Sequence, residues 1–498
     1  MTVINQSSIS GITSITMPSG DGNVLTIHTN DGTERFRIDS SGNVKVGSAC
    51  TISQDGDVFF TGVCTATTLT GAASGLTGAL PAIDGSALTG IAATDNVRTG
   101  ILDVAGIATF RNDVNIGAAV TISESGIEAS GIGITCANIN GAQIGGRRNL
   151  IINGAMNVAQ RATSATTNGY GSVDRFTIFF TGTDESPTQA QVDVASGTTP
   201  YTLGFRKSLK ITNGNQTSGA GAADYIIIRT ILEAQDIANS GWNYLSSSSN
   251  ITLSFWVKSS VAQNFYGNLW SQDGTQYNYV FETGSLSADT WTKVTKTIIG
   301  NSNLTFNNDN GAGLRVQLVP FLGTNSTGTR PLNAWAAFDS STIQPDNTST
   351  WYTTNDATLE ITGLQLEVGS QATTFEHRSY GEEIALCGRY YQKLIDANTK
   401  ALGIGFAYNG STMQLSFPYP LGKMRTAPSI DAVTGADYWR VEGGGVTMQI
   451  DGSWIAEHST DTQMSFYGVP DATLSTVGLS HYVRSLDSAA KFAFSAEL

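Results

Sequence analysis

The sequence predicts an all-β protein with an elongated trimeric β shaft, then a jelly-roll β-sandwich and a small C-terminal β domain. Charged residues are only 14% of the chain and glycines number 55 of 498. The remaining polarity comes mainly from Ser, Thr and Asn, which favour strands and turns over helix interiors. All eight tryptophans lie beyond residue 147, so the glycine-rich first part differs in kind from the rest. The predicted segments are 1–24 (an N-terminal attachment segment), 25–147 (shaft), 148–385 (sandwich) and 386–498 (tip).

Composition also excludes several classes of protein. A net charge of −14, with only 27 Lys and Arg, argues against binding to nucleic-acid phosphates. No run of 18 or more apolar residues is present, which excludes a transmembrane helix, and residues 1–10 lack the features of a signal peptide. The four cysteines form neither a disulfide framework nor a CxxC metal motif: Cys50, Cys64, Cys136 and Cys387.

The shaft is predicted from an internal repeat of 14 residues. Residues 36–46 align with residues 50–60, so that each apolar or glycine position recurs 14 residues later: Ile38 and Ile52, Gly42 and Gly56, Val44 and Val58. Each unit reads as a strand, a glycine-containing turn and a second strand. Weaker copies follow at 109–117 and 120–127.

One such hairpin cannot bury its apolar face, whereas three chains wound about one axis could. The repeat therefore favours a homotrimeric shaft. The alternative is a flexible Gly/Thr linker, but a linker has no reason to keep Ile and Val at matched positions.

Residues 148–385 are predicted to form the sandwich. In the segment 251–257 the residues Ile251, Leu253, Phe255 and Val257 share one face of a strand, and similar alternation recurs at 291–298, 314–319 and 359–368. Many strands with long polar loops are typical of a jelly roll. One short helix is expected at 382–387, with acidic residues at its N-terminus.

Residues 386–498 are predicted to form a separate small β domain. The segment 446–450 alternates between apolar and polar residues, and the pair Asp451-Gly452 follows it. An Asp-Gly pair between strands is a signal for a type I′ hairpin turn, so a hairpin into Ser453–Ile455 is expected.

Several stretches resemble the fibres of tailed bacteriophages. Residues 25–44 resemble a shaft repeat of these fibres, and residues 148–161 followed by 174–176 resemble the opening of a sandwich module that is similar to carbohydrate-binding jelly rolls. The end of that module is matched by residues 364–378 and 387–392. The C-terminal module is matched by Phe417-Pro418, Met424-Arg425 and Ala427-Pro428.

The resemblance implies a homotrimeric virion tail fibre that binds the host cell surface, through a polysaccharide or an outer-membrane receptor. It implies that residues 1–24 attach to a phage tail adaptor or nozzle protein, and no nucleic-acid partner is expected. Two alternatives stay open: a capsid-surface decoration fibre without a receptor role, and a tail spike that degrades glycans. Many relatives of the shaft carry a self-cleaving C-terminal chaperone, for which this sequence shows no match.

The candidate receptor-binding residues are aromatics with polar neighbours, because sugar rings stack on aromatic side chains. In the tip, Trp439 and Val441 share the core face, which places Tyr438 and Arg440 on the other face. In the sandwich, Trp270 and Tyr277 flank a polar loop at 271–274, with Tyr279 beside them. The alternative for Trp270 and Tyr279 is an ordinary place in the core.

No catalytic residue or cofactor is expected, and the chain is predicted not to be an enzyme. The HExxH, GxSxG and GxxxxGK[ST] motifs are missing, and the four histidines lie far apart and read as surface or capping residues: His28, His377, His458 and His481. A structural Ca²⁺ in the sandwich is compatible with the acidic loops around Asp346 and Asp356.

Overall fold

The computed structural model confirms the all-β fold class. It describes residues 24–63, 65, 114–116, 120–123, 126–129, 138–139, 142–143, 148–474 and 476–498, and the chain divides into two units between residues 111 and 112. The predicted attachment segment, apart from residue 24, lies outside the described residues, as do Cys64 and Cys136. In the described part of the chain, no helix is long and apolar enough to cross a membrane.

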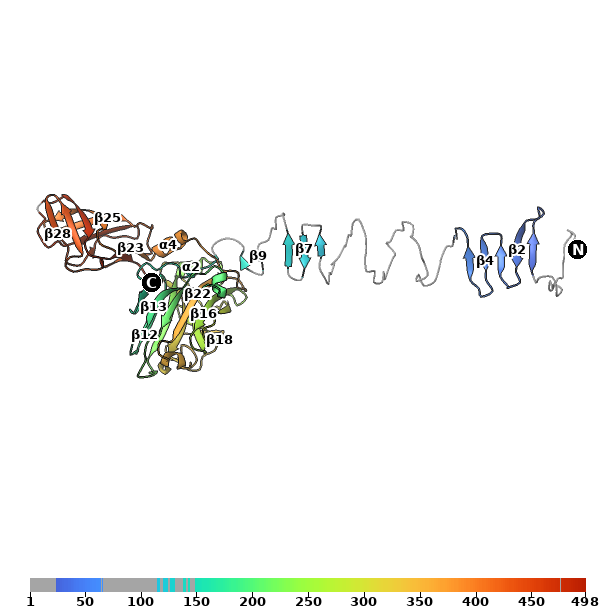
Figure 1. Cartoon of the computed structure of the whole chain (residues 1–498), viewed down its shortest axis with the longest axis horizontal. Helices are drawn as coiled ribbons and strands as arrows, with labels where there is room; N and C mark the ends of the chain where they lie inside the picture. Colours follow the sequence, from blue (N-terminus) through green and yellow to red (C-terminus); the bar gives the residue numbers. More distant parts are fainter. Residues whose placement is uncertain are drawn as a thin grey trace. The chain divides into compact units, whose positions relative to one another are not determined.

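The described part of the first unit is a five-stranded antiparallel meander, seen in Figure 1 as neighbouring arrows. Three of its turns are alike: a glycine with positive φ closes each one, at Gly32, Gly42 and Gly56. In each turn this glycine donates its N–H to the carbonyl three residues earlier. The strands are β1 (Leu25–His28), β2 (Glu34–Ile38), β3 (Val44–Val46), β4 (Cys50–Ile52) and β5 (Val58–Phe60).

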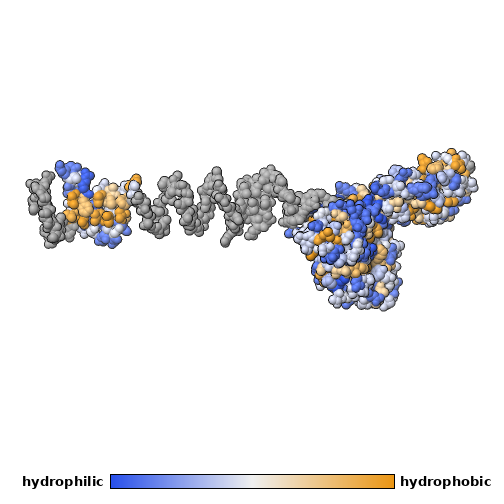
Figure 2. All heavy atoms as spheres, turned by 180° about the vertical axis from the view of Figure 1, so that it is seen from behind, coloured by the Kyte–Doolittle hydropathy of each residue, from blue (hydrophilic) through white to orange (hydrophobic). Residues whose placement is uncertain are grey.

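One face of this meander is entirely apolar, because the apolar residues of neighbouring strands stand directly opposite each other. Ile52, for example, pairs with Val44 on one side and with Val58 on the other. No residue between 24 and 63 is buried, and the Phe60 side chain is 51% exposed. Figure 2 shows the apolar side chains as a band across this segment. The apolar face comprises Leu25, Ile27, Phe36, Ile38, Val44, Val46, Cys50, Ile52, Val58 and Phe60.

The weaker repeat copies predicted at 109–117 and 120–127 contain antiparallel strands of one sheet: β6 (Val114–Ile116), β7 (Val120–Ser123) and β8 (Gly126–Ala129). A further antiparallel pair, β9 (Asn138–Ile139) and β10 (Ala142–Gln143), follows outside the predicted copies.

The sandwich consists of two six-stranded antiparallel sheets. We call them the first and the second sheet. In spatial order the first sheet is β11 (Ser164–Ala165), β13 (Thr188–Asp193), β14 (Lys207–Thr212), β22 (Thr358–Val368), β16 (Asn250–Ser259) and β19 (Thr292–Ile299). The second sheet is β12 (Thr177–Thr181), β15 (Tyr225–Glu233), β20 (Ala312–Leu322), β17 (Asn264–Ser271), β18 (Tyr277–Ser285) and β21 (Trp335–Ala337).

The alternation predicted along β16 is confirmed: Ile251, Leu253, Phe255 and Val257 are buried in the core between the sheets. In β22 the alternation shifts by one residue at Gly363, where the pairing with β16 is irregular. Gly363 has a φ of +64°. A Cβ atom there would lie 2.6 Å from the Phe205 ring, so the shift depends on glycine.

The helices are short. They are α1 (Thr199–Thr202), α2 (Ala234–Ala238), α3 (Thr350–Thr353), α4 (Tyr380–Gly388) and a 3-10 turn at Thr324–Ser326. The helix expected at 382–387 is confirmed as part of α4, which begins with a capping box between Ser379 and Glu382. This helix spans the predicted domain boundary between residues 385 and 386.

The C-terminal domain contains a three-stranded and a seven-stranded sheet. The three-stranded sheet is β23 (Tyr391–Ile395), β32 (Phe492–Ser495) and β26 (Ser429–Ala432). The seven-stranded sheet is β28 (Val446–Gln449), β27 (Trp439–Gly443), β31 (Ser480–Ser485), β24 (Ala401–Asn409), β25 (Thr412–Pro418), β30 (Gln463–Gly468) and β29 (Ile455–Ala456).

The predicted hairpin at Asp451-Gly452 is wrong. The strands before and after this pair, β28 and β29, lie at opposite edges of the seven-stranded sheet. A type I′ turn needs positive φ at both central residues, and Gly452 does not have one. The hairpin instead joins β27 to β28 through Gly443–Gly445, three glycines that all have positive φ.

A buried charged joint connects the sandwich to the C-terminal domain. Arg175 is 2% exposed and forms an ion pair with Glu497, and its guanidinium lies 3.4 Å from the ring centroid of Tyr390. Arg161 contacts the same carboxylate at 3.2 Å and lies over the ring of Tyr391. Burial by itself would lower the pKa of Arg175, but Glu497 holds that pKa above its ordinary value.

Candidate functional site

The predicted sandwich residues do not offer a free aromatic surface. Phe338 stacks on the Trp270 ring at 4.0 Å between centroids, and the Arg315 guanidinium lies 4.6 Å from the same ring. Tyr277 packs against the sandwich core, and Tyr279 is 4% exposed within it. The core alternative is thus confirmed for Tyr279, while Trp270 lies on the outer face of the second sheet with its ring already covered.

In the C-terminal domain the predicted parity holds for three residues and fails for Tyr438. Trp439 and Val441 are fully buried, and Arg440 is partly exposed beside Glu442 at 3.5 Å. Tyr438 is half-buried and packs against the core of this domain. It precedes the first residue of β27, so strand alternation does not apply to it.

The exposed apolar surface beside Arg440 is a strip on the same face of the seven-stranded sheet. Ile404 is 73% exposed and stands opposite Tyr482, which in turn stands opposite Glu442. Tyr408 is 62% exposed and contacts Phe406 edge-on. This strip is the available aromatic surface of the C-terminal domain near the predicted residues.

A different place in the sandwich combines aromatic walls with a cavity. On β16 the core residues leave Trp256 on the outer face of the first sheet, where it packs against a small cluster that includes Phe205 and Phe375. Beside it opens a cavity of about 200 Å³. We call it the Trp256 pocket; it is lined by Leu203, Phe205, Ser254, Trp256, Lys293, Gly363, Thr373, Thr374, Phe375 and His377.

Three rings form one wall of the Trp256 pocket. Phe205, Phe375 and His377 contact one another with centroid separations of 4.9–5.1 Å. The His377 Nε2 lies 2.9 Å from the Leu203 carbonyl oxygen. Because a carbonyl oxygen can only accept, Nε2 donates this hydrogen bond and fixes the ring.

The polar side chains of the Trp256 pocket are donors and hydroxyls. Lys293 stands directly opposite Trp256 on the neighbouring strand and is exposed. Ser254, Thr373 and Thr374 add hydroxyl groups, which both donate and accept. No carboxylate is among the residues lining the cavity. Aromatic walls with a few polar groups are the usual composition of a small-molecule site.

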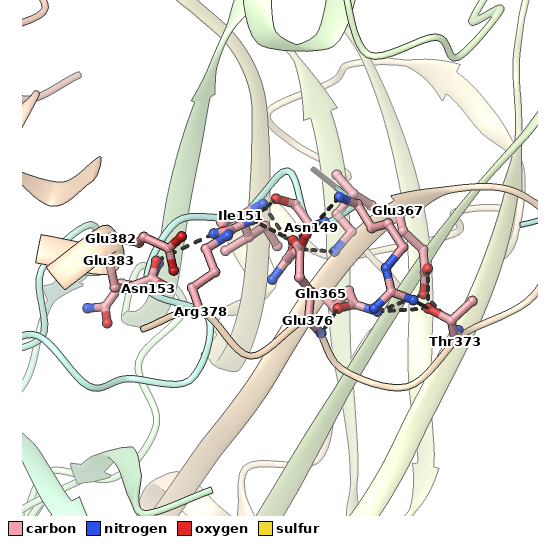
Figure 3. Close-up of polar contacts among 12 residues, drawn as sticks. Asn149, Ile151, Asn153, Gln365, Glu367, Thr373, Glu376, Arg378, Glu382 and Glu383 are labelled. Atoms are coloured by element: carbon pink, nitrogen blue, oxygen red, sulfur yellow. Dashed lines mark hydrogen bonds and ion pairs between the residues drawn. The ribbon is translucent and has the colours of Figure 1, made fainter. Parts of the chain in front are cut away.

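A partly buried polar network holds the loop that carries two of the pocket rings (Figure 3). Glu376, which lies between Phe375 and His377, accepts hydrogen bonds from the backbone N–H of Asn149 at 2.8 Å and of Arg148 at 3.1 Å. The Arg378 guanidinium pairs with it at 2.9 Å. Residues at the start of the sandwich segment therefore fix the loop that lies near the end of that segment.

The same network also anchors an earlier part of this loop. Thr373 donates both its N–H and its hydroxyl to Glu367, at 2.8 and 2.6 Å. Gln365 donates to Glu367 and accepts the N–H of Glu376, both at 2.8 Å. Figure 3 shows these side chains converging from β22 and from the loop. The pocket wall is thus built on fixed side chains.

No protein-family model matches the chain, and no curated protein sequence matches it. Among solved structures, the enzymatically active domain of tailspike protein 4 of bacteriophage CBA120 is similar over 44% of this chain and 21% of that chain, with 10% identity and a TM-score of 0.24. A family 11 carbohydrate-binding module from Clostridium thermocellum, in complex with a mixed-linked tetrasaccharide, is similar over 42% of this chain and 96% of the module, with 9% identity and a TM-score of 0.20. The chain thus spans about a fifth of the tailspike structure. Similarities of this size do not assign a function.

Neither Asp346 nor Asp356 is among the residues that line the Trp256 pocket. Within the described ranges, no group of three or more His, Cys, Asp or Glu side chains is arranged to hold a metal ion. Asp346 accepts a hydrogen bond from the Thr327 hydroxyl at 2.5 Å. The calcium ion expected near Asp346 and Asp356 stays a prediction. Of the four histidines, His377 is the one that contributes to the pocket.

Loss of the Glu376 charge is expected to loosen the pocket wall in a pH-dependent way. Burial by itself would raise the pKa of Glu376, but the Asn149 and Arg148 N–H groups and Arg378 lower it below the ordinary value of 4.5. A lowered folded-state pKa stabilises the fold above pH 4.5, and this stabilisation is lost as the pH falls through the folded-state pKa. We expect Glu376→Gln to cost about 1.5–3 kcal/mol of unfolding free energy at pH 7. The difference from the unaltered chain should shrink toward zero in acid.

The control for this pH series is Asp193→Asn, which removes an exposed carboxylate that pairs with Lys207 at 2.6 Å. Surface pairs contribute about 0–1 kcal/mol, so its effect should stay small throughout. A Glu376→Gln effect that is independent of pH would contradict the proposed role of the charge.

Proposed function

We propose that this chain is a trimeric virion fibre of a tailed bacteriophage, and that its sandwich binds a glycan of the host cell surface in the Trp256 pocket. The pocket is the observation that supports glycan binding best. Sugar rings present apolar faces that suit aromatic walls such as Trp256 and Phe375, while their hydroxyls suit Ser, Thr and Lys side chains.

The proposal is one of binding and not of cleavage. Hydrolysis of a glycosidic bond ordinarily uses a pair of carboxylates on either side of the scissile bond. The lining of the Trp256 pocket offers hydroxyls, an amine and aromatic rings instead. A glycan in this place would be held without a carboxylic acid among the lining residues.

The trimeric part of the proposal is supported by the apolar face of residues 25–60. A contiguous exposed apolar face of ten residues is typical of an interaction surface. Other copies of this chain are suitable to cover this apolar face, because each copy presents the same apolar residues at the same positions of its paired strands. Three chains would also present three glycan sites, which gain strength by avidity even when each one is weak.

Substitution of Trp256 tests the glycan site directly. We expect Trp256→Ala in the full chain to weaken binding to purified host-surface polysaccharide at least about tenfold, which corresponds to about 1.4 kcal/mol. Binding can be measured by calorimetric titration. The polysaccharide should keep its length after prolonged incubation with the protein, as judged by size-exclusion chromatography.

The matched control is Trp335→Ala in the second sheet. Trp335 is also half-buried, contacts Tyr279 edge-on and donates its indole N–H to the Ile299 carbonyl at 2.8 Å. Equal loss in both variants would mean that the effect is structural. Normal binding by Trp256→Ala would place the glycan elsewhere or favour a decoration fibre, and shortened polysaccharide would favour a glycan-degrading spike.

A further inference from the structure

Two arginines lie side by side on the outer face of the second sheet, away from the Trp256 pocket. Arg229 on β15 stands opposite Gln317 on β20, and Arg315 is two residues before Gln317 on the same strand and face. The two arginines are therefore diagonal neighbours, a spacing of roughly 7–8 Å between Cα atoms. Each guanidinium lies over an aromatic ring: Arg229 over Phe179 at 4.4 Å and Arg315 over Trp270 at 4.6 Å.

Neither arginine has a carboxylate close to it in the described part of the chain. The charged or titratable groups that act on Arg229 are Arg315, Tyr170 and Tyr225, and the group that acts on Arg315 is Tyr170. Burial and the like charge of Arg315 lower the pKa of Arg229 to about 10, and burial lowers the pKa of Arg315. Both guanidinium groups carry a charge at neutral pH, because arginine is not deprotonated in proteins. In a chain with 41 acidic and 27 basic residues, two adjacent arginines without an acidic partner are unusual.

Other polar groups around the two arginines also lack partners. Thr177 stands directly opposite Arg229 and is fully buried, yet its hydroxyl has no hydrogen-bond partner among the described residues. The Nε of Arg315 is buried and unpartnered as well. When the Gln317 amide is oriented with its oxygen toward Arg229, it accepts from that guanidinium at 2.5 and 2.8 Å and donates to Asn268 at 3.1 Å.

We propose that Arg229 and Arg315 form a binding site for an anionic group, a carboxylate or a phosphate, on the outer face of the second sheet. Guanidinium groups match both anions because they donate parallel hydrogen bonds in a planar fork. The Phe179 and Trp270 rings hold the forks in place, which reduces the entropy lost on binding. An anion would neutralise the repulsion between the two charges.

Thermal unfolding of the full chain with small anions tests this site. Inorganic phosphate and D-glucuronate are the probes, glucose is the neutral control, and the ionic strength is kept constant with chloride. We expect the unfolding temperature to rise with the concentration of at least one anion, since a ligand that binds the folded state stabilises it. Phosphate alone, glucuronate alone or both would identify which anion the site accepts.

Variants separate this site from general charge effects. We expect Arg315→Gln and, independently, Arg229→Gln to weaken the anion effect at least tenfold, while Arg35→Gln in the first unit leaves it unchanged. Without anion, Arg315→Gln should unfold at a temperature no lower than that of the unaltered chain, because it relieves a repulsion. If Arg315 instead stabilised the fold through an ion pair, Arg315→Gln would lower the unfolding temperature.

The proposals of the anion site and of the glycan pocket can be contradicted independently of each other. Trp256→Ala should keep the full anion effect, because Trp256 lies on the other sheet. The proposal is overturned if neither anion stabilises the unaltered chain, or if both arginine variants respond to anions as the unaltered chain does.

Discussion

Ile52→Asp is expected to separate the proposed trimer into single chains. The unaltered chain should sediment near three times 52.4 kDa, and the variant near 52.4 kDa. Ile52 lies in the middle of the apolar face, between Val44 and Val58. In a trimer this substitution would bury three carboxylates without partners near the axis, at a cost of several kcal/mol for each.

The control is Thr51→Asp on the same strand. Thr51 stands between Lys45 and Phe59 on the opposite face of the meander, so its carboxylate should remain in water. We expect this variant to sediment as a trimer. A single-chain mass for the unaltered protein at micromolar concentration, or trimers of Ile52→Asp, would contradict the shaft model.

Glu497→Gln should produce the largest loss of folding stability. The substitution preserves the shape of the side chain but leaves Arg175, which is 2% exposed, and Arg161 without their counter-charge. Removing one partner of a buried ion pair typically costs about 3–5 kcal/mol. We expect the C-terminal domain to unfold before the sandwich in denaturant, so that one transition becomes two.

Glu457→Gln in the same domain is the matched control. Its carboxylate is 48% exposed and lies 3.9 Å from His458, so its removal should change the unfolding free energy by less than about 1 kcal/mol. Unfolding of Glu497→Gln in one transition at the unaltered midpoint would show that the charged joint does not couple the two parts.

Sequence patterns predicted the elements that are stabilised by residues close together in the chain. The 14-residue repeat predicted the strands from β2 to β5, because the turn glycines and the alternating side chains act within one hairpin. The core face of β16 and the short helix within α4 followed in the same way. The hairpin at Asp451-Gly452 was wrong because the neighbouring Gly443–Gly445 turn supplies the positive φ angles that the alternative pairing requires.

The candidate site depended on contacts that no local pattern contains. Alternation along β16 places Trp256 on the strand face that points away from the core. The sequence alone could therefore have identified this residue as a candidate. Its companions Phe205 and Phe375 come from distant segments, brought together at a shift in β22 that only Gly363 permits. Arg229 and Arg315 likewise meet only through strand pairing, whereas Tyr438 lies just outside the strand whose alternation was used to place it.

The turn at Gly42 recurs at Gly56, and this sets how the proposed fibre can vary in length. Excision of residues 43–56 would join Gly42 to Asp57, recreate the same turn and put Val58 in the place of Val44, with every apolar side chain still on one face. Excision of an odd number of residues would turn the following strand over. Each 14-residue unit contributes two strands, each about 4.8 Å from the next. The proposed fibre can therefore be lengthened or shortened in steps of about 10 Å without altering the apolar face through which its copies would meet.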